Sequence, residues 1–403
     1  MRDDGESNVL KKISVEHLRL GMHVHELCGS WMDHPFWRSK FVISDVNDLN
    51  GIRESGITEL WIDVAKGLDV AVIEVRQTQM QPSPREEPPK RVSMAEETAR
   101  AAKICAKAKD AVASMYQEVR MGKTFDSEVA GGLVQEISSS VMRNPGALIS
   151  LARLKTADDY TYMHSVAVCA LMVALARQLN LDAKLTRELG MAGLLHDMGK
   201  AFTPPEILNK PGKLTDEEFT IMRQHPVEGH KVLLEGGAVG EIPLDVSLHH
   251  HEKMDGNGYP ERLASEKISL YAKMGAVCDV YDAITSNRPY HAGWDPAEAI
   301  RRMTEWCKGH FDERIFKSFV KIIGIYPVGS LVRLESGRLA VVMEQSEKSL
   351  LTPKVKVFYS TRLKTYIMPE ILALSQAGSR EKIAGCEDAA TWGIKNLEQF
   401  LVQ

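Results

Sequence analysis

The chain has 403 residues, of which 44% are hydrophobic and 26% are charged, as expected for a globular protein of two or three domains. Its formal net charge of −4 argues against general binding of nucleic acid polymers or anionic membranes, although one local cationic pocket is compatible with it. Scattered cysteines, a polar acidic N-terminus and the lack of an apolar run of roughly 20 residues predict a soluble cytoplasmic protein without membrane contact.

Residues 1–85 predict a small α/β or mainly β domain. Short β-like runs at 41–43 and 60–64 alternate with turn signals such as Asn50-Gly51. The segment 81–90 has four prolines in ten residues, so it cannot form a helix or a central strand. His23, His25 and His34 lack acidic or cysteine partners at useful spacing, and we expect them to be surface or core side chains.

Residues 86–145 predict a Pro-rich linker followed by connecting helices. From Ser93 to about Met142 polar and apolar residues alternate at helical spacing, which indicates two helices and makes a homodimer one possible arrangement. Residues 146–325 predict a helical bundle, with helices at 160–179, 183–196, 215–224, 226–235, 266–285, 296–307 and 312–323. A capping box at Thr215 and an Asp295-Pro296 pair mark two helix starts. Residues 326–403 predict a β extension and a tail.

Histidines and carboxylates gather in the predicted bundle, where His196-Asp197 follows an apolar helix. Each could bind a metal, or the aspartate could bridge two cations roughly 3.5–4 Å apart, the separation used for in-line displacement at phosphorus. An isolated His-Asp pair is more often a buried histidine satisfied by its neighbour. The adjacent Gly199-Lys200 and the other histidines favour a metal site. In the run 249–251 neighbouring residues diverge by about 100°, so not all three can face one site.

The order of these motifs resembles the HD-GYP family, a branch of the HD metal-dependent phosphohydrolases that hydrolyse the bacterial second messenger cyclic di-GMP. The matching motifs are His196-Asp197-x-Gly199-Lys200, His225-Pro226, His250-His251-Glu252-x-x-Asp255-Gly256-x-Gly258-Tyr259-Pro260, Asp279-Val280-Tyr281-Asp282-Ala283 and Arg288-Pro289-Tyr290. The resemblance implies a mainly α fold, an HD-type bundle at 146–325. The first 140 residues resemble, more weakly, an uncharacterised domain that often precedes HD-GYP domains. Sensing or dimerisation there is inferred from position alone.

The resemblance also implies roles for individual residues. The metal ligands would be His164, His196, Asp197, His225, His250, His251 and Asp279, with Asp197 bridging. His249 would be a neighbour that binds no metal. Asp197 and Lys200 would be catalytic, Lys200 would bind a phosphate oxygen, and Arg288 would hold substrate phosphate in a bidentate contact. The expected reaction is hydrolysis of cyclic di-GMP to pGpG or GMP, with a metal-bridging hydroxide attacking phosphorus in line.

Two positions depart from the family pattern. Tyr160 stands where some members carry a glutamate that supports a third metal, so we expect two divalent transition metal ions per chain. Iron or manganese follows from the resemblance, and nickel or zinc suits the same ligands. His291 stands where the family usually has another basic residue; because its charge depends on pH, substrate affinity would differ from the family norm.

Other functions are compatible with the same residues. One is a non-catalytic cyclic-dinucleotide receptor, or a docking module for a diguanylate cyclase (GGDEF) protein. Another is an HD phosphohydrolase for a different nucleotide. We interpret the Gly-Tyr-Pro loop as a wall of the pocket in preference to a GGDEF docking surface.

Overall fold

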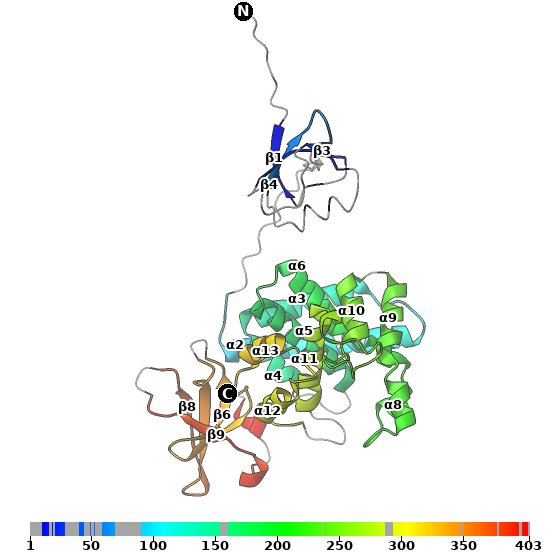
Figure 1. Ribbon diagram of the computed structural model, residues 1–403. Helices are drawn as coiled ribbons and strands as arrows, with labels where there is room; N and C mark the ends of the chain where they lie inside the picture. Colours follow the sequence, from blue (N-terminus) through cyan, green and yellow to red (C-terminus); the bar gives the residue numbers. More distant parts are fainter. Residues whose placement is uncertain are drawn as a thin grey trace, which may run out of the picture. The chain divides into compact units, whose positions relative to one another are not determined.

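The chain divides into two compact units, Met1–Arg85 and Glu86–Gln403 (Figure 1). The computed structural model describes residues 10–15, 18, 21–28, 40–43, 49, 52, 59–68, 90–153, 160–237, 239–286, 293–346, 349–376, 379–394 and 397–401. Within the described part, helices dominate the second unit and strands the first, so the predicted mainly α class is confirmed.

The described part of the first unit contains an antiparallel sheet. Its strands are β1 (Leu10–Ser14), β2 (His23–Cys28), β3 (Phe41–Val42) and β4 (Glu59–Asp63), in the order β1-β4-β2-β3. Side chains of a strand alternate between the two faces, and Ile13, Val24, Leu60 and Ile62 lie in one buried cluster. The two β-like runs expected from the sequence are therefore strands.

The second unit begins with a bundle of helices, coloured cyan to yellow in Figure 1. Its α-helices are α2 (Met94–Arg120), α3 (Ser127–Arg143), α4 (Pro145–Arg153), α5 (Tyr160–Gln178), α6 (Ala183–Leu195), α7 (Pro205–Leu208), α8 (Asp216–Met222), α9 (His225–Gly236), α10 (Glu241–His249), α11 (Leu270–Thr285), α12 (Pro296–Trp306) and α13 (Glu313–Ile323). Short 3₁₀ helices η2 (Met198–Phe202) and η3 (Ser265–Lys267) lie between them. The capping box at Thr215 and the cap formed by Asp295 are confirmed.

The sequence missed α10, which carries His249 and ends just before His250. Its third residue is Pro243, and a proline usually signals a break. In the first helical turn, however, the missing N–H is not needed for the helix ladder. The helix predicted over 266–285 begins later, at Leu270, because the Ser269 hydroxyl accepts a hydrogen bond from the Ala272 N–H and caps it there.

Helix α5 is the centre of the bundle, and 14 of its 19 residues are buried. Its side chains contribute to two hydrophobic clusters, one shared with α2 and α3 and the other with α11 and α13. Within the described residues α5 alone is long and apolar enough to cross a membrane. Its burial inside the protein accounts for that composition.

Helices α2 and α3, expected from the sequence as connectors, pack into the bundle core. Ala101, Cys105, Ala108 and Val112 of α2 are buried at helical spacing in the cluster shared with α5. Buried Glu97 of α2 accepts two hydrogen bonds from the Arg143 guanidinium of α3, at 2.7 and 2.8 Å. The apolar face expected from the sequence therefore packs on the bundle of the same chain.

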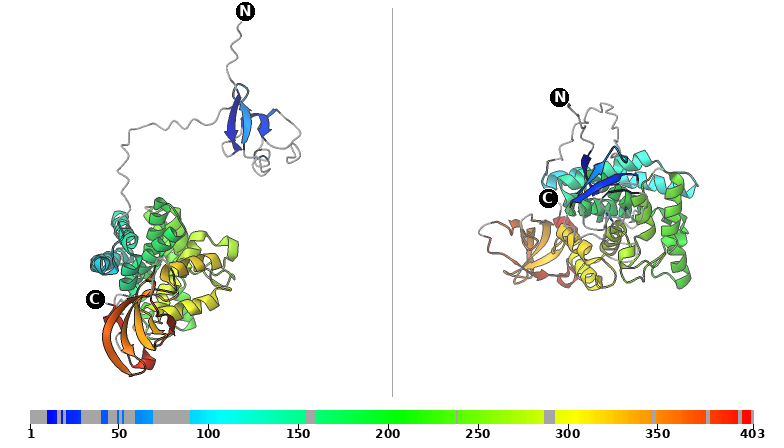
Figure 2. Two further views of the ribbon diagram at one scale, coloured as in Figure 1. Left: turned by 90° about the vertical axis from the view of Figure 1, so that its left-hand side faces the viewer. Right: turned by 45° about the horizontal axis from the view of Figure 1, so that its top comes forward.

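The unit ends in an antiparallel sheet, coloured orange to red in Figure 2. Its strands are β5 (Leu331–Leu334), β6 (Arg338–Glu344), β7 (Lys354–Ser360), β8 (Thr365–Ala373) and β9 (Ile383–Cys386), in the order β8-β7-β6-β5-β9. Alternating side chains of β6 serve two cores, Leu339 and Val341 on one face and Ala340 and Val342 on the other. The segment expected as a β extension is thus a sheet with apolar packing on both faces.

Candidate metal centre

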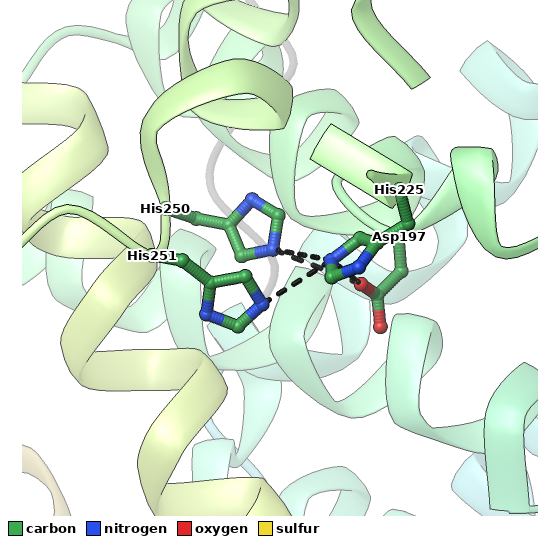
Figure 3. A group of neighbouring side chains, drawn as sticks. All are labelled: Asp197, His225, His250 and His251. Atoms are coloured by element: carbon green, nitrogen blue, oxygen red, sulfur yellow. Dashed lines mark hydrogen bonds and ion pairs between the residues drawn. The ribbon is translucent and has the colours of Figure 1, made fainter. Parts of the chain in front are cut away.

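Seven side chains from five places in the bundle meet in one cluster. His164 comes from α5, His196 and Asp197 from the turn after α6, His225 from the start of α9, His250 and His251 from the end of α10, and Asp279 from α11. They form two groups that could each hold a metal ion: Asp197, His225, His250 and His251, and His164, His196 and Asp279. Figure 3 shows the first group, in which three imidazoles surround one carboxylate. All seven ligands expected from the sequence are therefore close together.

Asp197 faces both groups at once. Its Oδ1 lies 3.2 Å from Nε2 of His225 and 3.7 Å from Nε2 of His250. Its Oδ2 lies 3.4 Å from Nε2 of both His164 and His196. A carboxylate with one oxygen in each group has the geometry needed to bridge two cations.

Backbone carbonyls orient three of the imidazoles. Nδ1 of His196 lies 2.8 Å from the Gly193 oxygen, and Nδ1 of His225 lies 2.7 Å from the Met222 oxygen. Nδ1 of His250 lies 3.0 Å from the carbonyl of residue 246. Because a carbonyl can only accept, each Nδ1 donates its proton, and Nε2 is left as the nitrogen that faces Asp197 and can bind a metal.

The inner nitrogens fit a cation better than they fit one another. Nε2 of His225 lies 3.4 Å from Nε2 of His250, and both imidazoles carry a proton on Nδ1. Two lone pairs cannot hydrogen bond to each other, whereas a divalent ion accepts both. Nε2 of His196 and Oδ1 of Asp197 are also buried without a hydrogen-bond partner among the described residues. The donor set therefore fits a metal centre.

His164 is oriented by a carboxylate that sequence reasoning missed. Its Nδ1 donates to Oδ2 of Asp282 at 2.6 Å, while its Nε2 points to Asp279 at 3.0 Å. The hydroxyl of Ser286 lies 3.3 Å from the other Asp282 oxygen. The available signal was the position of Asp282 three residues after Asp279, on the same face of one helix.

The cluster keeps its carboxylates ionised although they are buried. Burial opposes charge on Asp197, but the positive charges of Lys200 and His196 hold its pKa well below the ordinary value. Burial also opposes charge on His196, yet the neighbouring Asp197 and Asp279 carboxylates raise its pKa to about 10. For His225 burial dominates and lowers the pKa to about 4, so its imidazole is neutral at pH 7. Ionised Asp197 and neutral His225 are in the protonation states that metal binding requires, whereas His196 must lose a proton to a metal.

A cavity of about 670 Å³ opens onto the cluster. His164, His225, His251 and Asp279 form part of its wall. Three lysines, Lys200, Lys210 and Lys213, line the same cavity, together with Tyr259 and Trp294. Ammonium groups bind phosphate oxygens, and aromatic rings stack on nucleobases.

Lys200 lies between this cavity and the cluster. Its side chain is 17% exposed, and Nζ donates to Oδ2 of Asp197 at 2.5 Å. The residue reaches the cluster because η2 turns the chain back immediately after Asp197. From this position the ammonium group can bind an anion that enters the cavity.

The remaining residues considered in the sequence lie as follows. Tyr160 is at the start of α5, and its ring stacks on the His164 imidazole with centroids 5.7 Å apart. His249 lies outside the two groups and donates from Nδ1 to Asp245 at 2.8 Å. Arg288, His291 and His34 lie outside the described residues. His23 and His25 are partly buried on β2 and belong to neither group.

The Gly-Tyr-Pro loop packs directly against the segment that contains His251 and Glu252. A Cβ on Gly258 would come within 2.4 Å of the Glu252 Cα atom, so only glycine permits this approach. The Tyr259 ring stacks on the His251 imidazole, with centroids 4.7 Å apart. The Arg223 guanidinium lies 4.6 Å from the centre of the same tyrosine ring. These contacts support a pocket-forming role for the loop.

The helical bundle and its His/Asp cluster define an HD-domain protein, and residues 141–315 match the family described as "HD domain". Residues 10–130 match a "domain of unknown function (DUF3391)". The cyclic di-GMP phosphodiesterase PA4108 of Pseudomonas aeruginosa is 56% identical over 396 residues, 97% of this chain and 95% of that protein. The chain therefore belongs to the HD-GYP family.

Two further relatives match less than half of the chain. The cyclic di-GMP phosphodiesterase response regulator RpfG of Xanthomonas campestris is 37% identical over 180 residues, 43% of this chain and 47% of that protein. The 3'3'-cGAMP-specific phosphodiesterase 1 of Vibrio cholerae is 34% identical over 165 residues, 41% of this chain and 38% of that protein. The family thus includes proteins named for two different cyclic dinucleotides.

Proposed function

We propose that this protein is a metal-dependent phosphodiesterase that hydrolyses cyclic di-GMP to pGpG, GMP or both. The observation that carries the proposal is the placement of Asp197, with one oxygen toward each group of potential ligands. The relative that is 56% identical over nearly the whole chain is named for the same substrate. The cavity beside the cluster combines ammonium groups with aromatic rings, as a guanine dinucleotide requires.

In this proposal the metal ligands are the seven clustered residues His164, His196, Asp197, His225, His250, His251 and Asp279. Bound divalent ions would supply Lewis-acid activation of the phosphate and of the attacking water. Lys200 would bind a non-bridging oxygen of the scissile phosphate and stabilise the charge that develops there. Arg288 would hold a second phosphate by a bidentate contact, which remains a prediction from the sequence.

We propose two metal ions per chain. The aromatic ring of Tyr160 lies against His164, one helical turn before it, where a carboxylate would be needed to support a third ion. Imidazole and carboxylate ligands suit iron, manganese, nickel or zinc, and family resemblance favours iron or manganese.

The decisive experiment follows the products of cyclic di-GMP by chromatography. Metal-free protein is loaded with iron or manganese under anaerobic, reducing conditions and incubated with the substrate. We expect linear pGpG or GMP to form, and Asp197→Ala to abolish turnover while the variant remains folded by circular dichroism. Absence of turnover with every metal tested, or full activity of Asp197→Ala, would refute the proposal.

3'3'-cGAMP is the second candidate substrate because a relative that is 34% identical over 165 residues is named for it. The same assay run with equal concentrations of both dinucleotides compares their kcat/KM values directly. Binding without turnover of either one would instead favour a receptor or a docking module for a GGDEF protein. A cytoplasmic location, a GGDEF partner and a homodimer remain predictions from the sequence.

A further inference from the structure

Asp197 and Lys200 lie on one short turn whose backbone must be held in place. The turn follows α6, and the Asp197 carbonyl accepts a hydrogen bond from the Lys200 N–H at 2.9 Å. On the side facing α9, a Cβ on Gly199 would come within 1.9 Å of the His225 oxygen. Ser247 of α10 donates to the carbonyl of His196 at 3.3 Å. Two helices that carry potential ligands thus support the turn.

Helix α2 supports the same turn from another direction, although it carries no potential ligand. The Tyr116 hydroxyl donates to the Asp197 carbonyl at 2.9 Å. Nε of Arg120 donates to the Ala201 carbonyl at 3.0 Å. Tyr116 and Arg120 are four residues apart and therefore share one face of α2. The two bonds hold both ends of the segment that contains Asp197 and Lys200.

We propose that Tyr116 and Arg120 of α2 are positioning residues for the metal centre. The inference rests on the proposed function and adds residues from outside the matched HD domain. Both lie within residues 10–130, which match a family of unknown function. That region therefore contributes a structural part of the centre, in addition to any role of the first unit.

These two bonds matter because a carboxylate that bridges two ions tolerates little displacement of its oxygens. Both Asp197 oxygens must be placed within about 0.5 Å for two ions to be held, and the side chain follows its own backbone. Tyr116 is buried, and its ring packs edge-on against Tyr162, with centroids 5.5 Å apart, so its hydroxyl is fixed. Removing that hydroxyl would leave the packing intact and free the Asp197 peptide to rotate.

The test compares Tyr116→Phe with Tyr162→Phe in the full-length protein. Tyr162 is the neighbouring ring on α5, and its hydroxyl has no hydrogen bond within the described part of the chain. Manganese affinity is measured by competition with a fluorescent chelator, beside the melting temperature of the metal-free form. We expect Tyr116→Phe to weaken manganese binding about five- to tenfold, the effect of one lost hydrogen bond. Tyr162→Phe should bind manganese like the wild type.

Arg120→Gln provides an independent second variant, because the exposed guanidinium contributes little to the core. It should lower kcat more than it changes KM, since it acts on the backbone that places Lys200 and Asp197 at the scissile phosphate. Unchanged manganese affinity in both α2 variants, with only a lower melting temperature, would overturn the inference and leave the proposed function intact. A wild-type chain that binds manganese but hydrolyses no dinucleotide with any metal tested would refute the proposed function alone. A wild-type chain that binds none of iron, manganese, nickel and zinc would overturn both.

Discussion

Asp282 offers a direct test of the proposed metal centre, because it contacts His164, a proposed ligand, without being a proposed ligand itself. Its carboxylate accepts the Nδ1 proton of His164 at 2.6 Å, and both side chains are less than 4% exposed. In Asp282→Asn the amide can donate to Nδ1 instead, which moves the imidazole proton to Nε2 and blocks the lone pair needed by a metal. The shape of the side chain is nearly unchanged.

The expected loss is large for a residue that binds no ion. Partners of metal-binding histidines typically contribute 10- to 100-fold to metal affinity, about 1.4 to 2.7 kcal/mol. The short buried bond to a charged acceptor places Asp282 in the upper part of that range. Ser286→Ala should lose less, because its hydroxyl lies 3.3 Å from the far oxygen of Asp282.

The assay is chelator competition with manganese, and the chain offers a matched control. Asp245 accepts the Nδ1 proton of His249 at 2.8 Å, the same chemistry around a histidine that lies outside the cluster. Asp245→Asn should leave manganese affinity unchanged. If Asp282→Asn also bound manganese within twofold of the wild type, the carboxylate would have no role in orienting His164 and the reasoning would be wrong.

Three further predictions concern the same centre. Lys200→Met should lower kcat about 100-fold, as loss of one donor to the reacting phosphate does, while metal content measured by elemental analysis stays the same or rises. Tyr160→Glu should raise the number of bound metal ions from the proposed two to three, whereas Tyr160→Phe should keep two. An unchanged number in the glutamate variant would contradict the inference that a carboxylate at position 160 supports a third ion. Lowering the pH should weaken metal binding. Burial opposes charge on His196, but the carboxylates of Asp197 and Asp279 raise its pKa to about 10. Below that pH a metal must therefore displace a proton from His196. Chelator competition at pH 6, 7 and 8 should show affinity rising about tenfold per unit for each proton released, and a flat profile would refute this assignment.

Much of the bundle was predictable because its signals are local. Capping residues such as Thr215 and Asp295 fix helix starts through bonds to nearby N–H groups, and both were visible in the sequence. Helix α10 was missed because Pro243 can lie in a first turn as well as end a helix. The place of α2 was missed because an apolar face at helical spacing does not show which surface will cover it.

The potential ligands were predictable only through the order of family motifs, since His164 and Asp279 are 115 positions apart and no spacing rule joins them. The residues around them were not predictable in the same way. Asp282 lay inside a recognised motif, but its bond to His164 depends on how α5 and α11 pack. Tyr116 lay outside every motif, and its contact with the Asp197 backbone spans 81 positions.

The scatter of the seven clustered residues along the chain affects folding as well as catalysis. Five segments, from α5 to α11, converge on one cluster, so a divalent ion there would cross-link distant parts of the bundle. An ion at 100 times its dissociation constant stabilises the native state by about 2.7 kcal/mol when it does not bind the unfolded chain. The same ions would then slow proteolysis of the protein, and a shortage of metal would lower its abundance as well as its activity.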